Sequence, residues 1–341
     1  MKGFRVAILG ATGLVGQEFI KVLVQRNFPM ESISLLASDR SAGKKMFVAH
    51  QELEVKEAVP ESFREIDIAL FSAGTETSHH FSPIAARAGA VVIDNSAAFR
   101  MTSSVPLVVP EINPEDIKWH RGIIANPNCS TIQMVVALYP LHKVNPIKRI
   151  IVSTYQSVSG TGSAAIEELT TQARQVLDGQ NTAPHVYPHQ IAFNVLPEID
   201  VFLDNGYTKE EWKMVEETRK IMRADDINIS ATCARVPVFN GHSEAVNVEF
   251  SQSMSPEEAR RILAQAQGVK VLDDPVISLY PQSWAATGTD EVFVGRIRQD
   301  VSNTKGLVMW IAADNLRKGA ALNAVQIAEE MIKRNWVHPG G

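Results

Sequence analysis

Apolar positions in the first 130 residues follow two alternating patterns. Short, mostly apolar runs of strand length occur at 4–9, 33–37, 66–71 and 90–94, with shorter runs at 107–109 and 122–125. Several of these runs precede stretches whose apolar residues recur at helical spacing, as at 17–25. Buried parallel strands are typically continuous apolar runs, and helices usually connect them. The alternation predicts an α/β fold with a Rossmann-like, doubly wound parallel sheet.

The pattern changes after residue 141. Long β-type runs at 149–156, 229–238, 244–250 and 306–313 are accompanied by helical stretches at 164–177, 210–224 and 256–265. Long strands with fewer crossovers indicate a mixed α+β domain with a large sheet. A final helical stretch at 315–334 is expected to return to the first domain. The predicted domains are therefore 1–128, completed by 315–341, and 129–314, whose large sheet would suit catalysis and pairing with a second subunit.

Composition narrows the class of protein. A chain of 341 residues has room for two domains with sizeable cores. The net charge of −5 gives no electrostatic reason to expect nucleic acid or an anionic membrane as partner, and no apolar run is long enough to span a bilayer. The N-terminus lacks a signal-peptide pattern. Only two cysteines occur, and we interpret both as reduced thiols of a cytoplasmic protein. We predict no metal site, because His185 and His189 lack partners at zinc-ligand spacing.

A glycine-rich turn follows the first predicted strand directly. Its sequence, Gly10-Ala-Thr-Gly-Leu-Val-Gly16, has G-x-x-G-x-x-G spacing and leads into the helical stretch at 17–25. Glycines let such a turn approach a pyrophosphate closely, and the phosphates then lie at the helix N-terminus. Because the turn lies between a strand and a helix, it predicts a dinucleotide site.

The residues that follow the second predicted strand indicate whether the dinucleotide is NAD or NADP. An acidic residue there is typical of NAD binding, whereas an arginine accommodates the additional phosphate of NADP. This chain has both, Asp39 and Arg40, with Ser38, Ser41 and Lys44 nearby. A solvated polar loop is the alternative. The cluster favours NADP.

A cysteine lies where a turn meets an apolar helical run. Pro127 forces Asn126 into extended chain, Asn128 is a suitable helix N-cap, and Cys129 then falls in the first turn of the helix. Free backbone N–H groups and the helix dipole at that position favour a thiolate, which attacks carbonyl carbon. A buried structural cysteine is the alternative. We predict that Cys129 is a nucleophile.

Three sequence features together resemble one known family. They are the Gly10–Gly16 turn, the Asn-Pro-Asn-Cys-Ser-Thr run at 126–131, and Arg235 followed seven residues later by His242. The chain is similar over essentially its whole length to the aspartate-β-semialdehyde dehydrogenases. The resemblance implies NADPH-dependent reduction of L-4-aspartyl phosphate to L-aspartate 4-semialdehyde and phosphate, through a thioacyl intermediate on Cys129. It also implies a place in lysine, diaminopimelate, threonine, methionine and isoleucine biosynthesis, and a homodimer.

The resemblance assigns roles residue by residue. The implied catalytic residues are Cys129 as nucleophile, His242 as acid–base and Gln156, which orients the intermediate. The implied substrate residues are Arg235 and Glu217 for the amino-acid end and Arg100, Asn128 and Lys220 for phosphate. The expected cofactor residues are Gly10, Thr12, Gly13, Leu14, Val15, Ser38, Arg40, Ser41, Ser72, Gly74, Ser159, Gly160 and Asn315.

Several of these residues have plainer interpretations. His242 could be a solvated loop histidine, Gln156 could pair with backbone, and Lys220 on a charged helix is solvated by default. Arg235 interrupts an apolar strand, and because an unpaired buried charge is costly it should face a site or a partner. Two other functions remain open: N-acetyl-glutamyl-phosphate reductase, and a dinucleotide-binding protein of the same fold without catalysis.

Overall fold

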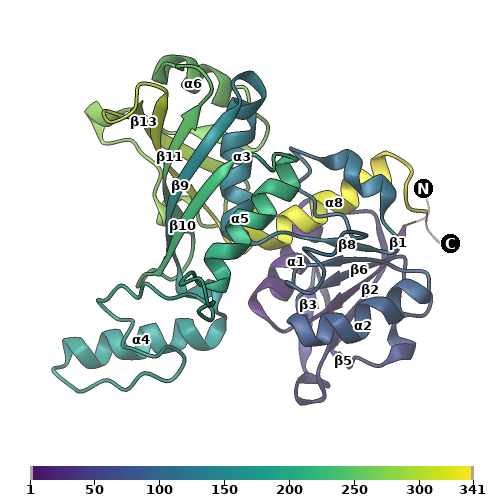
Figure 1. Ribbon diagram of the computed structural model, residues 1–341. Coiled ribbons are helices and arrows are strands. Elements are labelled where there is room, and N and C mark those ends of the chain that lie inside the picture. The colour runs from purple at the N-terminus through teal and green to yellow at the C-terminus, as the bar shows by residue number, and fades with distance from the viewer. Residues whose placement is uncertain (1–2, 339–341) are drawn as a thin grey trace. The chain divides into compact units, whose positions relative to one another are not determined.

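The computed structural model describes residues 3–338, and the chain divides into two compact units (Figure 1). The first unit comprises Met1–Asn128 and Ala320–Gly341, and the second comprises Cys129–Gly319. The C-terminal segment thus joins the first unit at Ala320 rather than at residue 315. Within residues 3–338, no helix is both long and apolar enough to cross a bilayer.

The first unit is built on a six-stranded sheet in which every pair of neighbours is parallel. The strands, in spatial order, are β5 (Lys56–Glu57), β2 (Met30–Ala37), β1 (Phe4–Leu9), β6 (Ile68–Phe71), β7 (Val91–Asp94) and β8 (Ile123–Ala125). The helices of this unit are α1 (Leu14–Gln25), α2 (Thr75–Arg87) and α8 (Leu322–Lys333). The predicted doubly wound sheet is confirmed.

The central strand β1 supplies side chains to two separate cores. Val6 and Ile8 belong to the core that contains residues of α1 and α8, such as Val325. Ala7 and Leu9 belong to a second core, which includes Ala85 of α2. Because side chains alternate along a strand, a strand that is apolar at consecutive positions, as β1 is from Val6 to Leu9, must be covered on both faces. The apolar run in this strand is explained in this way.

Three details of the first unit differ from the sequence prediction. The run at 107–109 forms only an isolated bridge, between Leu107 and Ala125. An antiparallel hairpin of β3 (Lys45–Val48) and β4 (Gln51–Glu54) was not predicted. Helix α8 begins at Leu322, after a π-helical turn at Arg317–Ala321, and not at residue 315.

The second unit contains a mixed six-stranded sheet, as predicted. In spatial order its strands are β10 (Asn228–Arg235), β9 (Ile147–Gln156), β11 (His242–Phe250), β14 (Gly306–Ala313), β13 (Val292–Gln299) and β12 (Val269–Val271). The β10–β9 and β12–β13 pairs are parallel, and the other neighbours are antiparallel. Strands β12 and β13 were not predicted.

Helices α3 (Cys129–Val144) and α5 (Lys209–Met222) pack against the strands of this sheet and against each other. Helix α3 has no exposed polar face along this stretch: its residues from Ser130 to Leu138 are all buried, the polar Ser130, Thr131 and Gln133 included. A helix without a polar face belongs in a core. The unit also contains α4 (Ser163–Leu177), α6 (Pro256–Leu263) and the short α7 (Ser283–Ala286).

Candidate active site

The glycine-rich turn of the first unit is a tight backbone cradle. Gly10 has φ +88°, and a Cβ atom there would lie 2.7 Å from the Ser72 carbonyl oxygen. A Cβ atom on Gly16 would lie only 2.1 Å from the Gly10 carbonyl oxygen. The N–H groups of Gly10 and Ala11 both donate to the Leu36 carbonyl oxygen, which ties the turn to β2. Residues with side chains are therefore excluded at positions 10 and 16.

The N-terminus of α1 has the properties of an anion site. Gly13 is its N-cap and supplies no side-chain cap, and the first turn contains no acidic residue. Ser72, directly after β6, has a buried hydroxyl with no hydrogen-bond partner among residues 3–338. Gly74 has φ +86° and open space where a side chain would be. Free helix N–H groups, an orphaned hydroxyl and room for a ligand fit the phosphates of a dinucleotide.

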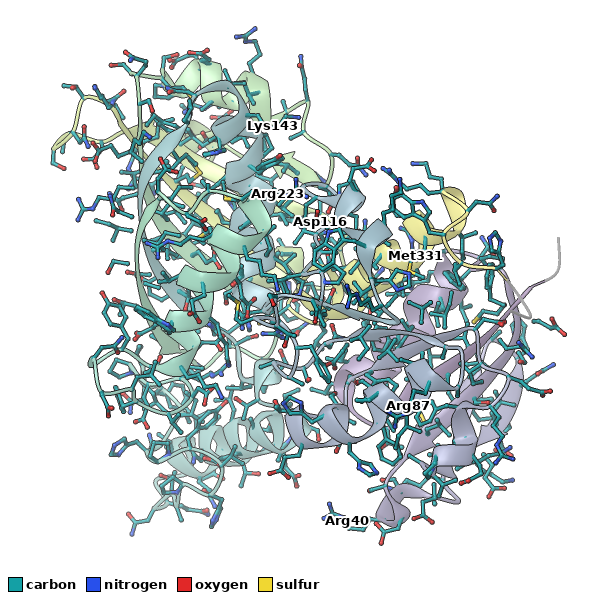
Figure 2. The ribbon with its side chains drawn as sticks, turned by 45° about the vertical axis from the view of Figure 1, so that its right-hand side comes forward. Arg40, Arg87, Asp116, Lys143, Arg223 and Met331 are labelled. Carbon is teal, nitrogen blue, oxygen red and sulfur yellow. The ribbon has the colours of Figure 1, made fainter. Side chains whose placement is uncertain are left out.

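The loop after β2 places its charged groups outward. Ser38 precedes a short 3-10 turn at Asp39–Ser41, and the Asp39 carboxylate accepts a hydrogen bond from the Arg40 N–H at 2.7 Å. The Arg40 side chain is exposed and lies at the outer tip of its unit (Figure 2). Lys44 Nζ donates to Ser41 Oγ at 3.3 Å. The Asp39 carboxylate is occupied by a backbone N–H group, whereas the Arg40 guanidinium is exposed. Arg40 is therefore the side chain that is available to bind the phosphate on an adenosine ribose.

The turn before the candidate nucleophile is held by buried polar contacts within the first unit. Arg100 Nε donates to the Asn126 carbonyl oxygen at 2.9 Å, and Nη2 donates to the Asn95 carbonyl oxygen at 2.7 Å. Asn323 of α8 donates to Asn126 Oδ1 at 2.7 Å. Asn128, also buried, is the last residue of the first of the two segments that form this unit. The segment before Cys129 is thus fixed at Asn126 by hydrogen bonds from both Arg100 and Asn323.

Cys129 begins α3 and is half-buried. Its surroundings in the second unit leave little room, since a Cβ atom on Gly319 would lie 2.9 Å from the Cys129 Cβ atom. The other cysteine, Cys233, is also a free thiol, but it is fully buried with its sulfur 3.8 Å from that of Met214. Burial raises the pKa of the Cys233 thiol. Of the two, only Cys129 has the exposure and the helix N-terminus that a nucleophile requires.

Strand register brings three candidate residues to one edge of the second sheet. Gln156 and Arg235 are the last residues of the parallel strands β9 and β10 and are register partners. His242 is the first residue of β11, which runs antiparallel to β9. The carboxyl ends of two parallel strands and the start of an antiparallel neighbour lie at the same edge of a sheet. Residues distant in sequence therefore meet there.

Gln156 has an acidic partner that the sequence prediction missed. Its Nε2 donates to Glu210 Oε1 at 3.2 Å, and Lys213 pairs with Glu210 at 3.2 Å. The predicted Glu217 lies seven residues further along α5, about 10 Å along the helix axis. Both pairs have Glu-x-x-Lys spacing, so spacing alone could not separate Glu210 and Lys213 from Glu217 and Lys220.

Arg235 is buried, yet part of its guanidinium has no partner. Nη1 donates to the Ser157 carbonyl oxygen at 2.7 Å, whereas Nε makes no hydrogen bond to any residue that the structure describes. A Cβ atom on Gly160 would lie 2.9 Å from Arg235 Nη1 and 3.2 Å from His242 Cε1, so a glycine is needed beside both side chains. A buried, unsatisfied donor on a charged group is costly and indicates a site for an anionic ligand.

His242 is completely buried, in contrast to the solvated alternative. Its Nδ1 accepts a hydrogen bond from the Ser157 N–H at 3.1 Å, and its Nε2 has no hydrogen-bond partner in the described part of the chain. Burial, assisted by the Arg235 charge, holds the pKa of the His242 imidazole well below its usual value. The ring is therefore neutral at pH 7.

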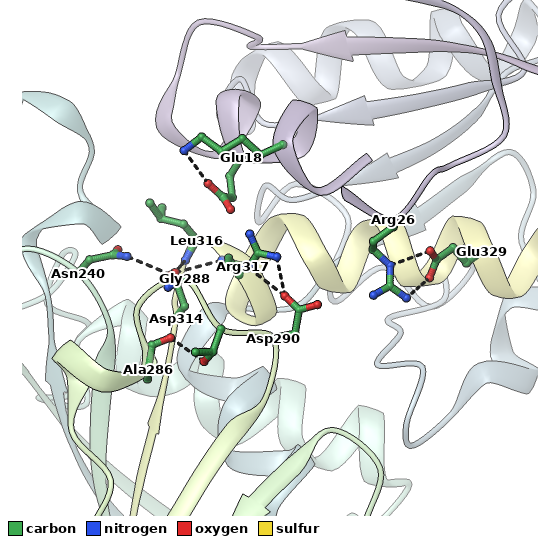
Figure 3. Close-up of polar contacts among 12 residues, drawn as sticks. Glu18, Arg26, Asn240, Ala286, Gly288, Asp290, Asp314, Leu316, Arg317 and Glu329 are labelled. Atoms are coloured by element: carbon green, nitrogen blue, oxygen red, sulfur yellow. Dashed lines mark hydrogen bonds and ion pairs between the residues drawn. The ribbon is translucent and has the colours of Figure 1, made fainter. Parts of the chain in front are cut away.

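Ser159 and Asn315 belong to the polar network around this histidine. Asn315 Oδ1 accepts from the Gly241 N–H at 2.9 Å, and Asn315 Nδ2 donates to Ser159 Oγ at 2.9 Å. The preceding Asp314 fixes the loop by accepting hydrogen bonds from Asn240, Gly288, Leu316 and Arg317 (Figure 3).

The structure therefore divides the candidate residues between the two units. One edge of the second sheet unites Gln156, Ser159, Gly160, Arg235, His242 and Asn315. The first unit contains Arg100, Asn128 and the remaining cofactor candidates: Gly10, Thr12, Gly13, Leu14, Val15, Ser38, Arg40, Ser41, Ser72 and Gly74.

Comparison with known proteins matches both units. Residues 5–120 match the family model "Semialdehyde dehydrogenase, NAD binding domain", and residues 138–318 match "Semialdehyde dehydrogenase, dimerisation domain". These two matches define the class as the semialdehyde dehydrogenases. The dimerisation model supports the predicted homodimer.

Individual relatives narrow the class. An aspartate-semialdehyde dehydrogenase of Aquifex aeolicus is 56% identical over 339 residues, which cover 98% of this chain and 100% of the relative. The crystal structure of aspartate semialdehyde dehydrogenase II from Vibrio cholerae, complexed with ASA, has a TM-score of 0.95 and 48% identity, and covers 98% of this chain and 99% of that one. A Candida albicans aspartate semialdehyde dehydrogenase with NADP has a TM-score of 0.77 and 28% identity, with coverage of 98% and 99%. The chain belongs to the aspartate-semialdehyde dehydrogenase family.

Proposed function

We propose that this chain reduces L-4-aspartyl phosphate to L-aspartate 4-semialdehyde with NADPH and releases phosphate. The observation that carries the proposal is the buried cluster of Gln156, Arg235 and His242 at one sheet edge, in a unit whose longest buried helix begins with Cys129. This cluster offers an amide, a carboxylate-binding guanidinium and an imidazole. The family's place in lysine, diaminopimelate, threonine, methionine and isoleucine biosynthesis follows from the same reaction.

Cys129 is the proposed nucleophile. Its thiolate sulfur bonds to the acyl carbon of the substrate, and the bond from that carbon to the phosphate oxygen breaks. NADPH, when bound, supplies a hydride to the resulting thioester carbon. The carbon–sulfur bond then breaks, and the electron pair returns to Cys129. The position of Cys129 at the N-terminus of α3 favours the thiolate both as the attacking group in the first step and as the leaving group in the last.

The amino-acid end of the substrate requires partners of both charges. Arg235 suits the carboxylate, because its buried Nε lacks a partner and a guanidinium binds carboxylates through two parallel hydrogen bonds. For the ammonium group we propose Glu210 in place of Glu217, since Glu210 contacts Gln156. Gln156, held between Glu210 and Thr154, orients the intermediate.

Phosphate binding is assigned to Arg100 and Asn128, with Lys213 considered beside Lys220 as the lysine. Arg100 is buried and two of its nitrogens donate to carbonyl oxygens, so it has a fixed orientation. Lys213 is bound to Glu210 and Asp200, and Lys220 lies further along α5. A lysine acts on phosphate as a point charge, whereas an arginine adds directional hydrogen bonds.

The proposed cofactor is NADP. Gly10, Thr12, Gly13, Leu14 and Val15 would hold the pyrophosphate at α1, with the orphaned Ser72 hydroxyl and Gly74 opposite. Ser38, Arg40 and Ser41 would hold the ribose phosphate. Ser159, Gly160 and Asn315 are proposed to border the nicotinamide. The NADP named for the Candida albicans relative supports this choice.

We also propose that the enzyme works as a homodimer in the cytoplasm. The dimerisation family model supports the oligomeric state, and two cysteines outside any disulfide, one of them the nucleophile, suit a reducing compartment. Sedimentation of the purified chain and fractionation of cells test these two statements.

The decisive experiment is phosphate-dependent reduction of NADP with aspartate semialdehyde. Parallel reactions use N-acetylglutamate semialdehyde as substrate, and Cys129→Ser as enzyme. We expect turnover with aspartate semialdehyde only, and its loss in the variant. Turnover with the acetylated substrate would assign the chain to the related reductase. NADP binding without turnover on either substrate would favour a non-catalytic protein.

A further inference from the structure

Helix α3 carries a buried glutamine one turn beyond the proposed nucleophile. Gln133 follows Cys129 by four residues, so the two side chains lie on the same side of the helix. The Gln133 side chain is completely buried, and neither its amide nitrogen nor its amide oxygen has a hydrogen-bond partner among residues 3–338. A buried amide without partners is costly, so this side chain requires an explanation.

The strand that this helix contacts carries a buried glutamate in the same condition. Glu244 lies on β11, against which α3 packs (Figure 1), and its side chain is completely buried. Neither of its carboxyl oxygens has a hydrogen-bond partner within the described residues. Burial raises the pKa of the Glu244 carboxyl group well above its usual value, and the adjacent Gln133 amide opposes this shift. The two unsatisfied side chains are therefore neighbours.

The sheet supplies no counter-charge at the position of Glu244. Strand register places Glu244 between Thr154 of β9 and Ile311 of β14, neither of which ionises. Cys233 of β10 comes next in the same row, and burial raises the pKa of its thiol. The Arg235 guanidinium belongs to β10, two strands from β11, which is about 10 Å in the plane of the sheet.

Helix α3 brings no cation close to Glu244 either. Apart from Cys129, its ionisable side chains lie in its second half: Tyr139, His142 and Lys143. The first basic residue among them is nine positions beyond Gln133, about 14 Å along the helix axis. On β11 itself the ionisable neighbour on the same face is His242, which is neutral at pH 7. A carboxyl group that is buried without a counter-ion keeps its proton.

A protonated carboxyl group and an amide can satisfy each other. The Glu244 hydroxyl can donate to Gln133 Oε1, and the Glu244 carbonyl oxygen can accept from Gln133 Nε2. A carboxylate only accepts, so it would leave the amide oxygen without a donor. We propose that Glu244 keeps its proton in the folded enzyme and pairs with Gln133, and that this neutral pair positions the first turns of α3, and thereby Cys129, on β11. The proposal rests on the proposed function, which makes Cys129 the nucleophile.

The absence of charge on this pair suits the proposed chemistry. The dipole at the N-terminus of α3 favours negative charge on the Cys129 sulfur. A carboxylate beside Gln133, one helical turn away, would oppose the thiolate, because like charges disfavour each other's ionised forms. A neutral acid supplies directional hydrogen bonds without this repulsion. Glu244 is therefore a positioning residue that acts through Gln133.

Infrared difference spectroscopy tests the protonation state without turnover. The spectrum of the wild type minus that of Glu244→Gln, at neutral pH, should show the carbonyl band of a protonated carboxylic acid. Glu257→Gln, which changes an exposed carboxyl group on α6, is the matched control and should show carboxylate bands. In Gln133→Met the acid band should move to higher frequency, because the carbonyl loses its donor. Carboxylate bands from Glu244, or an acid band that Gln133→Met leaves in place, would overturn the proposal.

The pH dependence of unfolding gives an independent measure of the same proton. An unfolded glutamate loses its proton at about pH 4.3, whereas the folded chain keeps that of Glu244, so the stability of the wild type should fall relative to Glu244→Gln as the pH rises. The ratio of the two unfolding constants should change about tenfold per pH unit above about pH 5. Urea-induced unfolding of both proteins measures it. A ratio that does not vary with pH would show that Glu244 is ionised in the folded state.

Kinetics with aspartate semialdehyde test the positioning of Cys129. Gln133→Met nearly keeps the shape of the side chain but removes its hydrogen bonds, so kcat should fall about 10- to 100-fold, as expected when a reacting group is slightly displaced. KM and NADP affinity should stay within about twofold. Glu244→Gln retains both a donor and an acceptor, and its kcat should stay within about fivefold of the wild type. Wild-type kcat in a folded Gln133→Met would overturn the positioning role.

A double variant separates positioning from folding. Gln133→Met combined with Glu244→Met leaves neither side chain with an unpaired polar group, so it should fold even if Gln133→Met does not. Because the hydrogen bonds are still missing, the loss of kcat should persist, and recovery of wild-type kcat would overturn the proposal. Absence of wild-type turnover would contradict the proposed function instead, while the infrared and unfolding results would still decide the protonation of Glu244.

Discussion

The glycine-rich cradle of the first unit and the sheet-edge cluster of the second prepare ligand sites by opposite means. The cradle removes side chains: Gly10 and Gly16 clear the backbone, and the helix N-terminus supplies N–H groups. The cluster concentrates side chains, with Gln156, Arg235 and His242 buried and largely fixed by hydrogen bonds. A backbone site depends on local chain geometry, whereas a side-chain site depends on strand register between distant segments. Mutations should therefore affect them differently.

The largest expected effect separates chemistry from binding. Cys129→Ala should lower kcat by roughly 10³-fold or more, because no other group can form the thioester, while NADP affinity stays within about twofold. Steady-state kinetics and fluorescence titration measure the two quantities. Cys233→Ala is the matched control, since Cys233 is the buried cysteine of the same unit. A comparable loss of activity in Cys233→Ala would contradict the assignment of Cys129 as the nucleophile.

A single added methyl group in the glycine-rich turn should disrupt NADP binding. Gly16→Ala places a Cβ atom 2.1 Å from the Gly10 carbonyl oxygen, so it should weaken NADP binding about 100-fold or prevent the first unit from folding. Gly13→Ala is the milder comparison, at another residue proposed to hold the pyrophosphate: its Cβ atom would lie 3.4 Å from the same oxygen, at φ −75°, so the loss of NADP affinity should be smaller. Calorimetric titration and thermal unfolding distinguish the two failures. Equal tolerance at both positions would mean that the turn does not bind the cofactor.

The sheet-edge cluster should respond at Glu210 rather than at Glu217. Glu210→Gln keeps the shape of the side chain but removes a charge, and a charged hydrogen bond contributes about 1.5–3 kcal/mol, so KM for aspartate semialdehyde should rise roughly 10- to 100-fold. Glu217→Gln, on the same helix, should change KM by less than about threefold. The opposite order of effects would restore the assignment based on sequence.

The smallest effect concerns cofactor choice. Arg40 is exposed, so Arg40→Ala should weaken NADP binding about tenfold, in proportion to one solvent-screened arginine–phosphate contact. NAD lacks that phosphate and serves as the internal control, with an expected change of less than about twofold. Dissociation constants for both dinucleotides provide the comparison. Equal losses would remove Arg40 from the phosphate site.

The two regions also differ in how far the sequence predicted them. The cradle was predictable because strand, glycines and helix are contiguous, and the doubly wound sheet followed from continuous apolar runs. The acidic partner of Gln156 was not predictable, because Glu210 and Glu217 have the same spacing to a lysine. Only the packing of α5 against the sheet shows that Glu210 is the one that lies beside Gln156. Strand β13 was missed because exposed and charged positions such as Arg296 and Arg298 interrupt its apolar pattern. The solvated alternative for His242 was wrong, since its burial depends on contacts with Ser157, which is 85 positions away.

The split composition of the first unit has a consequence for how the chain is made on the ribosome. Its larger core includes Leu322, Val325, Ile327 and Met331, which are synthesised only after the whole second unit, Cys129–Gly319. The parallel sheet emerges first but must wait for the whole second unit before its exposed apolar surface is covered. Domains generally fold as they emerge, and transiently exposed surface invites aggregation or chaperone binding. A nascent chain that stops before residue 320 should therefore be held by chaperones, even though its glycine-rich turn is already complete.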